Sequence, residues 1–235
     1  MEKKRLASFV LDILFPPRCP ICHEVTEIGS GICDECAERI YGKLRERERC
    51  SVCGKPIDSC VCEGDMVFER CVSAFCYDNE TSPMIIELKN HCSPDVTFKI
   101  ACMMRRALSE AGITAKQIGC VTEIPMSEER IAKGRVNFSR ELALILSEML
   151  KIEHREPPFV QNDSYLPQHS LNFKERAENA NSGYSAKEGG KIGGTVLLID
   201  DIVTTGATLK RCSELLIKCG AEKVICLTAA TTPKK

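Results

Sequence analysis

The sequence has no marked excess of charge of either sign. Its 32 basic and 33 acidic residues give a formal net charge of −1 over 235 residues. A protein that binds nucleic acid over most of its surface normally carries a strong positive charge, so this composition argues against that class and leaves room only for a local basic patch. With 43% hydrophobic and 28% charged residues, the composition is that of a folded globular chain.

Long hydrophobic stretches are also missing, and none of the apolar runs could span a membrane. Residues 1–20 superficially resemble a signal peptide, but Asp12 interrupts the apolar run and no small-residue cleavage site follows. We therefore expect a cytoplasmic protein without membrane insertion. We expect these residues to form an amphipathic helix that ends at Pro16 and packs on its own protein. Its apolar face comprises Leu6, Phe9, Val10, Ile13 and Leu14.

Cysteine, in contrast, is abundant and unevenly placed. Of 16 cysteines, eight lie between residues 19 and 62 as four closely spaced pairs. Such a pair supplies two thiolates to one tetrahedral zinc ion, and two pairs complete its coordination. The simplest arrangement predicts one site from the first four cysteines and another from the last four, with crossed pairing as the alternative. The eight are Cys19, Cys22, Cys33, Cys36, Cys50, Cys53, Cys60 and Cys62.

A disulfide framework is the alternative explanation for these cysteines. It requires an oxidising compartment, which the missing cleavage site argues against, so we interpret the pairs as ligands of structural zinc, in one or two sites. The other eight cysteines lie mostly in apolar segments, and we expect them to be buried thiols.

The chain divides into a cysteine-rich N-terminal part and a larger part of alternating elements. We expect an N-terminal helix and zinc-ribbon module in residues 1–65, with residues 63–65 as the junction, and a second domain in residues 66–235. Its strands, separated by helices, predict an α/β domain with a mainly parallel sheet. The polar residues 161–191 predict a long loop. Strands are predicted at 72–77, 120–124, 196–199 and 224–227, and helices at 82–92, 95–111, 137–151 and 209–219.

Residues 196–208, VLLIDDIVTTGAT, join a strand to a helix. The four aliphatic residues predict a strand buried on both faces, and Gly220 is a good stop for the helix that follows. In a strand–helix–strand unit, ligands bind beyond the carboxyl ends of the strands. We therefore expect the residues between the strand and the helix to bind a ligand.

The side chains at this point suit a phosphorylated sugar. Asp200 and Asp201 offer acceptors for a ribose diol or for waters on a hard cation such as Mg²⁺. Backbone N–H groups at a helix start favour an anion, Gly206 allows a close backbone approach, and threonine hydroxyls can donate to phosphate oxygens. The alternative, an ordinary capped turn, needs one Asp or Thr, whereas two acids and three threonines are present.

The stretch resembles the phosphoribosyl pyrophosphate (PRPP) signature of type I phosphoribosyltransferases, a hydrophobic run followed by two acids and a Thr-Thr-Gly-x-Thr loop. The resemblance implies that PRPP is bound, with Mg²⁺, by the acids and the loop. The implied ligands are Asp200, Asp201, Thr204, Thr205, Gly206, Ala207 and Thr208.

With the cysteine pairs in front, the whole chain resembles the ComF/GntX family of competence-associated phosphoribosyltransferase-like proteins. Residues 11–20 resemble the family's opening, and Tyr77 with residues 85–89 resembles its first strand and helix. The resemblance implies a pyrophosphate loop formed by Pro125, Met126, Ser127 and Arg130. It implies a flexible loop over the site that contains Gln168, Arg176 and Asn179. Lys89 is a further candidate for the ligand's phosphates, and the catalytic candidates are Asp200, Asp201, Arg130 and Arg176.

One segment departs from the family pattern. After the pyrophosphate loop the family usually shows Arg-Gly-aromatic-Asn-Gln, whereas this chain has Gly-Arg-Val-Asn-Phe at residues 134–138. The departure concerns the role of that turn and leaves the expected fold unchanged. Lys133 and Arg135 are additional cations from the same region that could face pyrophosphate.

The implied reaction is a Mg²⁺-dependent displacement of pyrophosphate at ribose C1 by an unidentified acceptor. Some members of the superfamily place an acid in the phosphate loop, where this chain has Thr204. Two other functions remain open. One is a PRPP-binding competence protein that performs no transfer and contacts single-stranded DNA or a helicase during DNA uptake. The other is a PRPP-sensing regulator.

Overall fold

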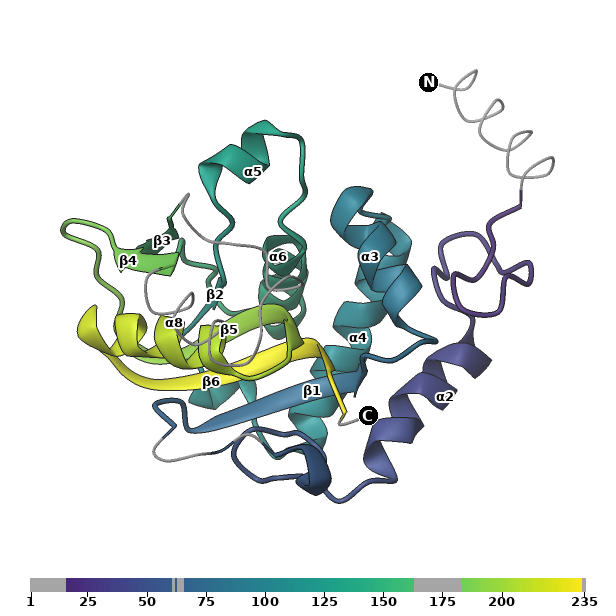
Figure 1. The fold of residues 1–235 in the computed structure, drawn as a ribbon, viewed down its shortest axis with the longest axis horizontal. Coiled ribbons are helices and arrows are strands. Elements are labelled where there is room, and N and C mark those ends of the chain that lie inside the picture. Colours follow the sequence, from purple (N-terminus) through teal and green to yellow (C-terminus); the bar gives the residue numbers. More distant parts are fainter. Residues whose placement is uncertain (1–15, 61, 63–65, 163–182, 234–235) are drawn as a thin grey trace.

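The structure is a computed structural model that describes residues 16–60, 62, 66–162 and 183–233 (Figure 1). Its centre is a four-stranded parallel sheet with the order β1-β6-β5-β2. This arrangement confirms the predicted α/β class with a mainly parallel sheet. The expected N-terminal helix and the junction at 63–65 lie outside the described residues. The strands are β1 (Arg70–Cys76), β2 (Cys120–Glu123), β5 (Gly194–Val203) and β6 (Ala221–Thr231).

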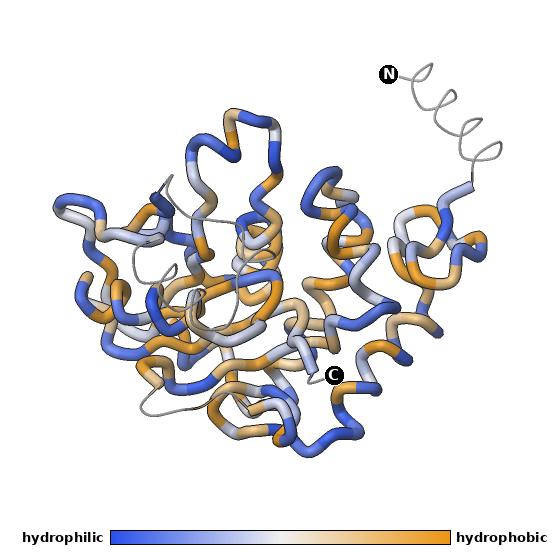
Figure 2. The backbone as a smooth tube through the Cα atoms, viewed as in Figure 1, coloured by the Kyte–Doolittle hydropathy of each residue, from blue (hydrophilic) through white to orange (hydrophobic). Residues whose placement is uncertain are grey.

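Strand β5 shows why the sheet needs cover on both faces. Its side chains alternate between the faces, as the pleat requires. Leu197 and Ile199 pack in one core beneath helices α4 and α6, while Val196 and Leu198 pack in the other beneath helix α8. Figure 2 shows the resulting concentration of hydrophobic residues along the central strands. The covering helices are α4 (Pro94–Glu110), α6 (Phe138–Leu150) and α8 (Ala207–Lys218).

Shorter elements surround this frame. Helices α3 (Ser82–Asn90) and α5 (Glu128–Ala132) follow β1 and β2, and short 3₁₀ turns lie at Ile57–Ser59 and Ala115–Gln117. None of the helices in the described part of the chain is long and apolar enough to cross a membrane.

A small hairpin corrects one expectation. Residues 161–191 were expected to be loop throughout, but β3 (Phe159–Gln161) and β4 (Tyr184–Ala186) pair as a two-stranded antiparallel sheet. The rings of Phe159 and Tyr184 pack edge to face at 6.3 Å and are almost fully buried. Strands of three residues are too short for their alternation to be read from the sequence. They form because the two rings anchor them on the core.

Helix α2 (Asp34–Arg45) connects the two cysteine-rich segments, which lie at its opposite ends (Figure 1). Its buried face, including Ile40 and Leu44, packs against β1 and α4. The Tyr41 ring lies between the guanidinium groups of Arg45 and Arg106, at 3.9 and 4.2 Å from its centroid. The helix thereby fixes both segments to the α/β domain.

The eight paired cysteines form two clusters that follow the simplest predicted arrangement. In each cluster the four sulfur atoms all lie within 4.8 Å of one another. The Sγ atoms of Cys22 and Cys33 are 3.9 Å apart, and those of Cys53 and Cys60 are 3.8 Å apart. Tetrahedral zinc with Zn–S bonds of about 2.3 Å separates its sulfur ligands by about 3.8 Å, whereas a disulfide joins sulfurs at about 2 Å. The geometry therefore fits zinc.

Because each cluster uses four thiolates and shares none with the other, removing one ligand should empty only its own site. We expect Cys19→Ser to reduce bound zinc from two equivalents to one and to lower thermal stability, because Cys19 is fully buried where the first cluster meets the core. Metal analysis of the purified protein measures the stoichiometry. Two retained equivalents would contradict this ligand set.

Candidate functional site

A cavity of about 350 Å³ lies at the carboxyl edge of the parallel sheet. Residues at or just beyond the ends of all four strands line it: Tyr77 after β1, Ile124 after β2, Asp200 and Asp201 near the end of β5, and Thr232 after β6. Parallel strands end at one edge, so residues far apart in sequence meet there. This is the edge at which the sequence predicted a ligand.

Unequal strand lengths open the cavity. Strand β5 was expected to end at Ile199, but its ladder with the longer β6 carries it on to Val203. Strand β2, in contrast, pairs only as far as Glu123, opposite Ile199. After one more hydrogen bond, from Ile124 N–H to the Ile199 carbonyl, Pro125 cannot donate to the ladder. The chain after β2 therefore leaves the sheet at the position of the two acids. On that side of β5, no strand pairs with Asp200 and Asp201 in the described residues.

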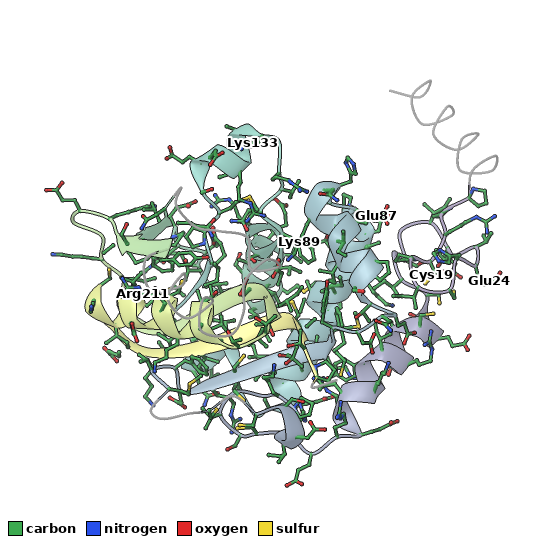
Figure 3. All side chains as sticks on the ribbon, in the orientation of Figure 1. Cys19, Glu24, Glu87, Lys89, Lys133 and Arg211 are labelled. Carbon is green, nitrogen blue, oxygen red and sulfur yellow. The ribbon has the colours of Figure 1, made fainter. Side chains whose placement is uncertain are left out.

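Each acid has a defined partner. The Ser139 hydroxyl, in the first turn of α6, donates to Asp200 Oδ1 at 3.1 Å, and the Asp201 N–H donates to the same atom at 2.9 Å. Lys89, at the end of α3, forms an ion pair with Asp201 at 2.7 Å. Figure 3 shows Lys89 extending from α3 toward the centre of the molecule. The pair places a cation at the cavity before any ligand is bound.

The close approach of Asp200, Asp201 and Lys89 shifts the pKa values of two of these groups. Burial and the neighbouring Asp201 charge raise the pKa of Asp200 to about 7, although the Asp201 N–H, Lys89 and Ser139 act in the opposite direction. Burial alone would lower the pKa of Lys89, but the two carboxylates raise it above its ordinary value. Lys89 is therefore charged, while Asp200 gains and loses its proton near neutral pH.

Residues Thr204 to Thr208 line the cavity next to the acids and lead into α8. Gly206 precedes the helix with a φ of 77°, a left-handed conformation that other residues adopt only at a cost. The Thr205 hydroxyl accepts from Ala207 N–H at 3.4 Å. The loop therefore presents the positive end of α8 to the cavity, as the sequence predicted.

The expected pyrophosphate loop lies opposite. Pro125 and Met126 line the cavity, whereas Ser127 is the N-cap residue before α5, and its N–H donates to Gln161 Oε1 at 2.8 Å. Arg130 lines the cavity with an exposed side chain. Lys133 pairs with Glu129 at the outer end of α5, away from the cavity (Figure 3).

The departure at residues 134–138 has a local explanation. Gly134 follows α5 with a φ of 74°, so this position favours glycine. Arg135 is exposed and lies outside the cavity lining drawn from the described residues. Asn137 caps α6 by accepting from Arg140 N–H and also donates to the Ile124 carbonyl. Phe138 is buried in the core, which suits an aromatic side chain where the family has Gln.

Several cavity residues were not singled out as ligands from the sequence. The Gln161 amide, besides holding Ser127, donates to the Tyr184 hydroxyl at 3.0 Å, so the β3–β4 hairpin supports the expected pyrophosphate loop. The cavity residues that were not singled out as ligands are Tyr77, Ser139, Gln161, Tyr184 and Thr232. The sequence carries a signal only for Tyr77, as part of the segment that resembles the family's first strand, and it did not indicate a ligand there. Three expected ligands, Gln168, Arg176 and Asn179, lie outside the described residues.

Two sequence families match successive parts of the chain. The phosphoribosyl transferase domain family matches residues 88–235, which begin in the last turn of α3 and include all residues of the acid-and-threonine loop. The double zinc ribbon domain family matches residues 10–77, which include both cysteine clusters. The second match also includes β1, which pairs with β6, so the boundary between the two families lies within the α/β sheet of the structure.

Curated relatives carry related names. The DNA utilization protein YhgH of Escherichia coli (strain K12) is 23% identical over 219 residues, which cover 89% of this chain and 94% of that protein. The transcriptional regulator GfcR of Picrophilus torridus is 26% identical over 124 residues, which cover 52% of this chain and 60% of that protein. With a double zinc ribbon ahead of a phosphoribosyl transferase domain, the chain belongs to the ComF/GntX family.

Proposed function

We propose that the cavity binds PRPP together with Mg²⁺ and that the protein displaces pyrophosphate at ribose C1. The observation that carries the proposal is the placement of two acids, a helix-start loop and the cations Lys89 and Arg130 around one cavity. PRPP needs these three environments: an anion cradle for the 5-phosphate, acceptors for the ribose hydroxyls and positive charge for the pyrophosphate. The domain match to phosphoribosyl transferases supports the same ligand.

Each part of the ligand has a matching group. The loop from Thr204 to Thr208 would hold the 5-phosphate through N–H groups and hydroxyls. Asp200 and Asp201 would accept from the ribose hydroxyls. Arg130 lies across the cavity, where its exposed guanidinium could bind pyrophosphate oxygens. Lys89 could exchange its bond to Asp201 for the ligand's phosphates.

The residues also fit the cation. Asp200 and Asp201 offer carboxylate oxygens, the ligand type that Mg²⁺ prefers, and the remaining positions would be filled by waters and ligand oxygens. When bound, Mg²⁺ neutralises the charge of the leaving pyrophosphate. The chain itself orients the sugar through the two acids and holds the 5-phosphate at the start of α8. These contacts position C1 for attack.

Transfer and binding without transfer make different demands. Transfer needs an acceptor and a group that takes its proton, and Thr204 stands in the loop where some relatives of the superfamily have an acid. The name of the YhgH relative, a DNA utilization protein, favours a second function in DNA utilisation. With the proposed ligand, such a protein would bind PRPP without transfer and contact single-stranded DNA. The name of the GfcR relative, a transcriptional regulator, favours a third function, a regulator that would respond to the proposed ligand.

Three assays separate these functions. Pyrophosphate release from PRPP in the presence of candidate acceptors would demonstrate transfer. Binding of single-stranded DNA whose affinity falls steeply with salt would support the second function, because such binding releases counterions. Binding of operator-like duplex DNA with an affinity that changes when PRPP is added would support the regulator.

We expect Asp200→Asn combined with Asp201→Asn to abolish saturable PRPP binding, because both negative charges that would hold the cation are lost and each side chain exchanges one acceptor oxygen for a donor. Titration calorimetry with PRPP and Mg²⁺ measures the affinity, and metal analysis should show unchanged zinc. The matched control is Asp34→Asn with Glu38→Gln, which removes two exposed charges from α2. Retained affinity in the double-aspartate variant would place the ligand elsewhere.

The pKa of Asp200 predicts a pH dependence of the ligand-free protein. Since the folded-state pKa, about 7, exceeds the ordinary 3.8, the folded state keeps a proton that the unfolded chain has lost between these values. The free energy of unfolding should therefore fall by on the order of 1–2 kcal/mol from pH 5.5 to 7 and then level off. Urea denaturation of the zinc-loaded protein without Mg²⁺ measures it. Asp200→Asn should lack this component, and parallel pH curves would contradict the assignment.

A further inference from the structure

Lys55 joins the second cysteine cluster to the phosphate loop. Its backbone carbonyl accepts from Cys50 N–H at 2.8 Å, inside the turn that holds Cys50 and Cys53. Its ammonium donates to the Thr204 carbonyl at 2.5 Å and to Thr232 Oγ1 at 3.1 Å. The residue is only 3% exposed. One residue therefore belongs to a metal-binding turn through its backbone and to the candidate ligand loop through its side chain.

The bond to Thr204 determines which way the next peptide faces. The carbonyl of a trans peptide and the N–H of the following residue point in opposite directions, and none of the described peptide bonds is cis. A Thr204 carbonyl held by Lys55 therefore directs the Thr205 N–H away from Lys55. A flipped peptide would turn this carbonyl around, and a carbonyl facing the cavity would repel a phosphate.

The turn that carries Lys55 is fixed on the sheet. Cys71 N–H, at the start of β1, donates to the Val52 carbonyl at 2.7 Å. Gly54 has a φ of 69°, and a Cβ there would lie 2.3 Å from the Cys71 carbonyl oxygen, so the turn approaches β1 as closely as backbone permits. Regular structure in described residues 50–60 is limited to the 3₁₀ turn at Ile57–Ser59 and an isolated bridge between Arg49 and Pro56. The cysteine cluster therefore adds to a small number of backbone bonds in shaping this segment.

The geometry couples the cysteine cluster to the loop through this one residue. A metal ion held by Cys50, Cys53, Cys60 and Cys62 would fix the turn whose Lys55 side chain reaches Thr204. Loss of the metal would therefore change the shape of the turn that holds Lys55 against the phosphate loop.

We propose that Lys55 is a positioning residue for the phosphate loop and that the metal of the second cluster maintains it. The second cysteine cluster would then hold the phosphate loop in place through Lys55, and the conformation of the loop would depend on metal in that cluster. The effect on PRPP affinity rests on the proposed function, whereas the effect on loop order does not.

The test uses the full zinc-loaded chain and the variant Lys55→Met, which keeps an unbranched buried side chain and removes its donors. We expect unchanged zinc content, faster amide hydrogen exchange in residues 203–208, and PRPP–Mg²⁺ affinity lower by about ten-fold. The control is Lys99→Met, which removes a bond from α4 to Asp34 on α2 and should leave exchange in 203–208 at the wild-type rate. Unchanged exchange there in Lys55→Met would overturn the proposal.

Metal dependence is tested by comparing one ligand from each cluster. Cys60→Ser should lose one zinc and increase exchange in 203–208, whereas Cys22→Ser should lose one zinc without that local increase. Equal increases of exchange in both variants, or no increase in Cys60→Ser, would overturn the proposal that the loop depends on the second cluster. Exchange of the α4 amides separates this local effect from global unfolding. Absence of PRPP binding in the wild type would refute the proposed function, and the exchange data would still decide the role of Lys55.

Discussion

The backbone ladder between β5 and β6 is the constraint on which the rest of the site depends. It continues four residues beyond the last pair of β2 with β5, up to Val203 opposite Thr231. The two acids therefore lie in extended backbone, with a partner strand on one side and open space on the other. Ser139 and Lys89 hold their carboxylates from the neighbouring helices α6 and α3. Rigid elements position polar groups more accurately than loops do.

Much of the frame could be predicted because its signals are local. The aliphatic run before Asp200 predicts a buried strand, and the glycine before α8 indicates a turn into a helix. Closely spaced cysteine pairs predict a metal cluster. Tertiary features were missed. The extension of β5 to Val203 comes from pairing with β6, and the hairpin comes from two rings that meet only in the fold. Tyr77 and Thr232 reach the cavity because four strand ends converge there.

Lys55 illustrates the same limit most clearly. Nothing around it in the sequence distinguishes it from a surface lysine next to a metal-binding turn. Its partner is 149 residues away. Only the docking of the turn on β1, through Val52 and Gly54, brings the two together. Sequence analysis assigned the cysteines to one part of the chain and the phosphate loop to another, while the packing makes them neighbours.

The ion pair between Lys89 and Asp201 gives the empty cavity an internal counter-charge. A divalent cation that entered alone would meet one carboxylate paired with Lys89 and another, Asp200, whose pKa burial and the neighbouring charge raise to about 7. An anion that drew Lys89 away would leave Asp201 open to a cation. For the proposed ligand, cation and anion would therefore favour each other's binding, and the site would select the pair over either ion alone.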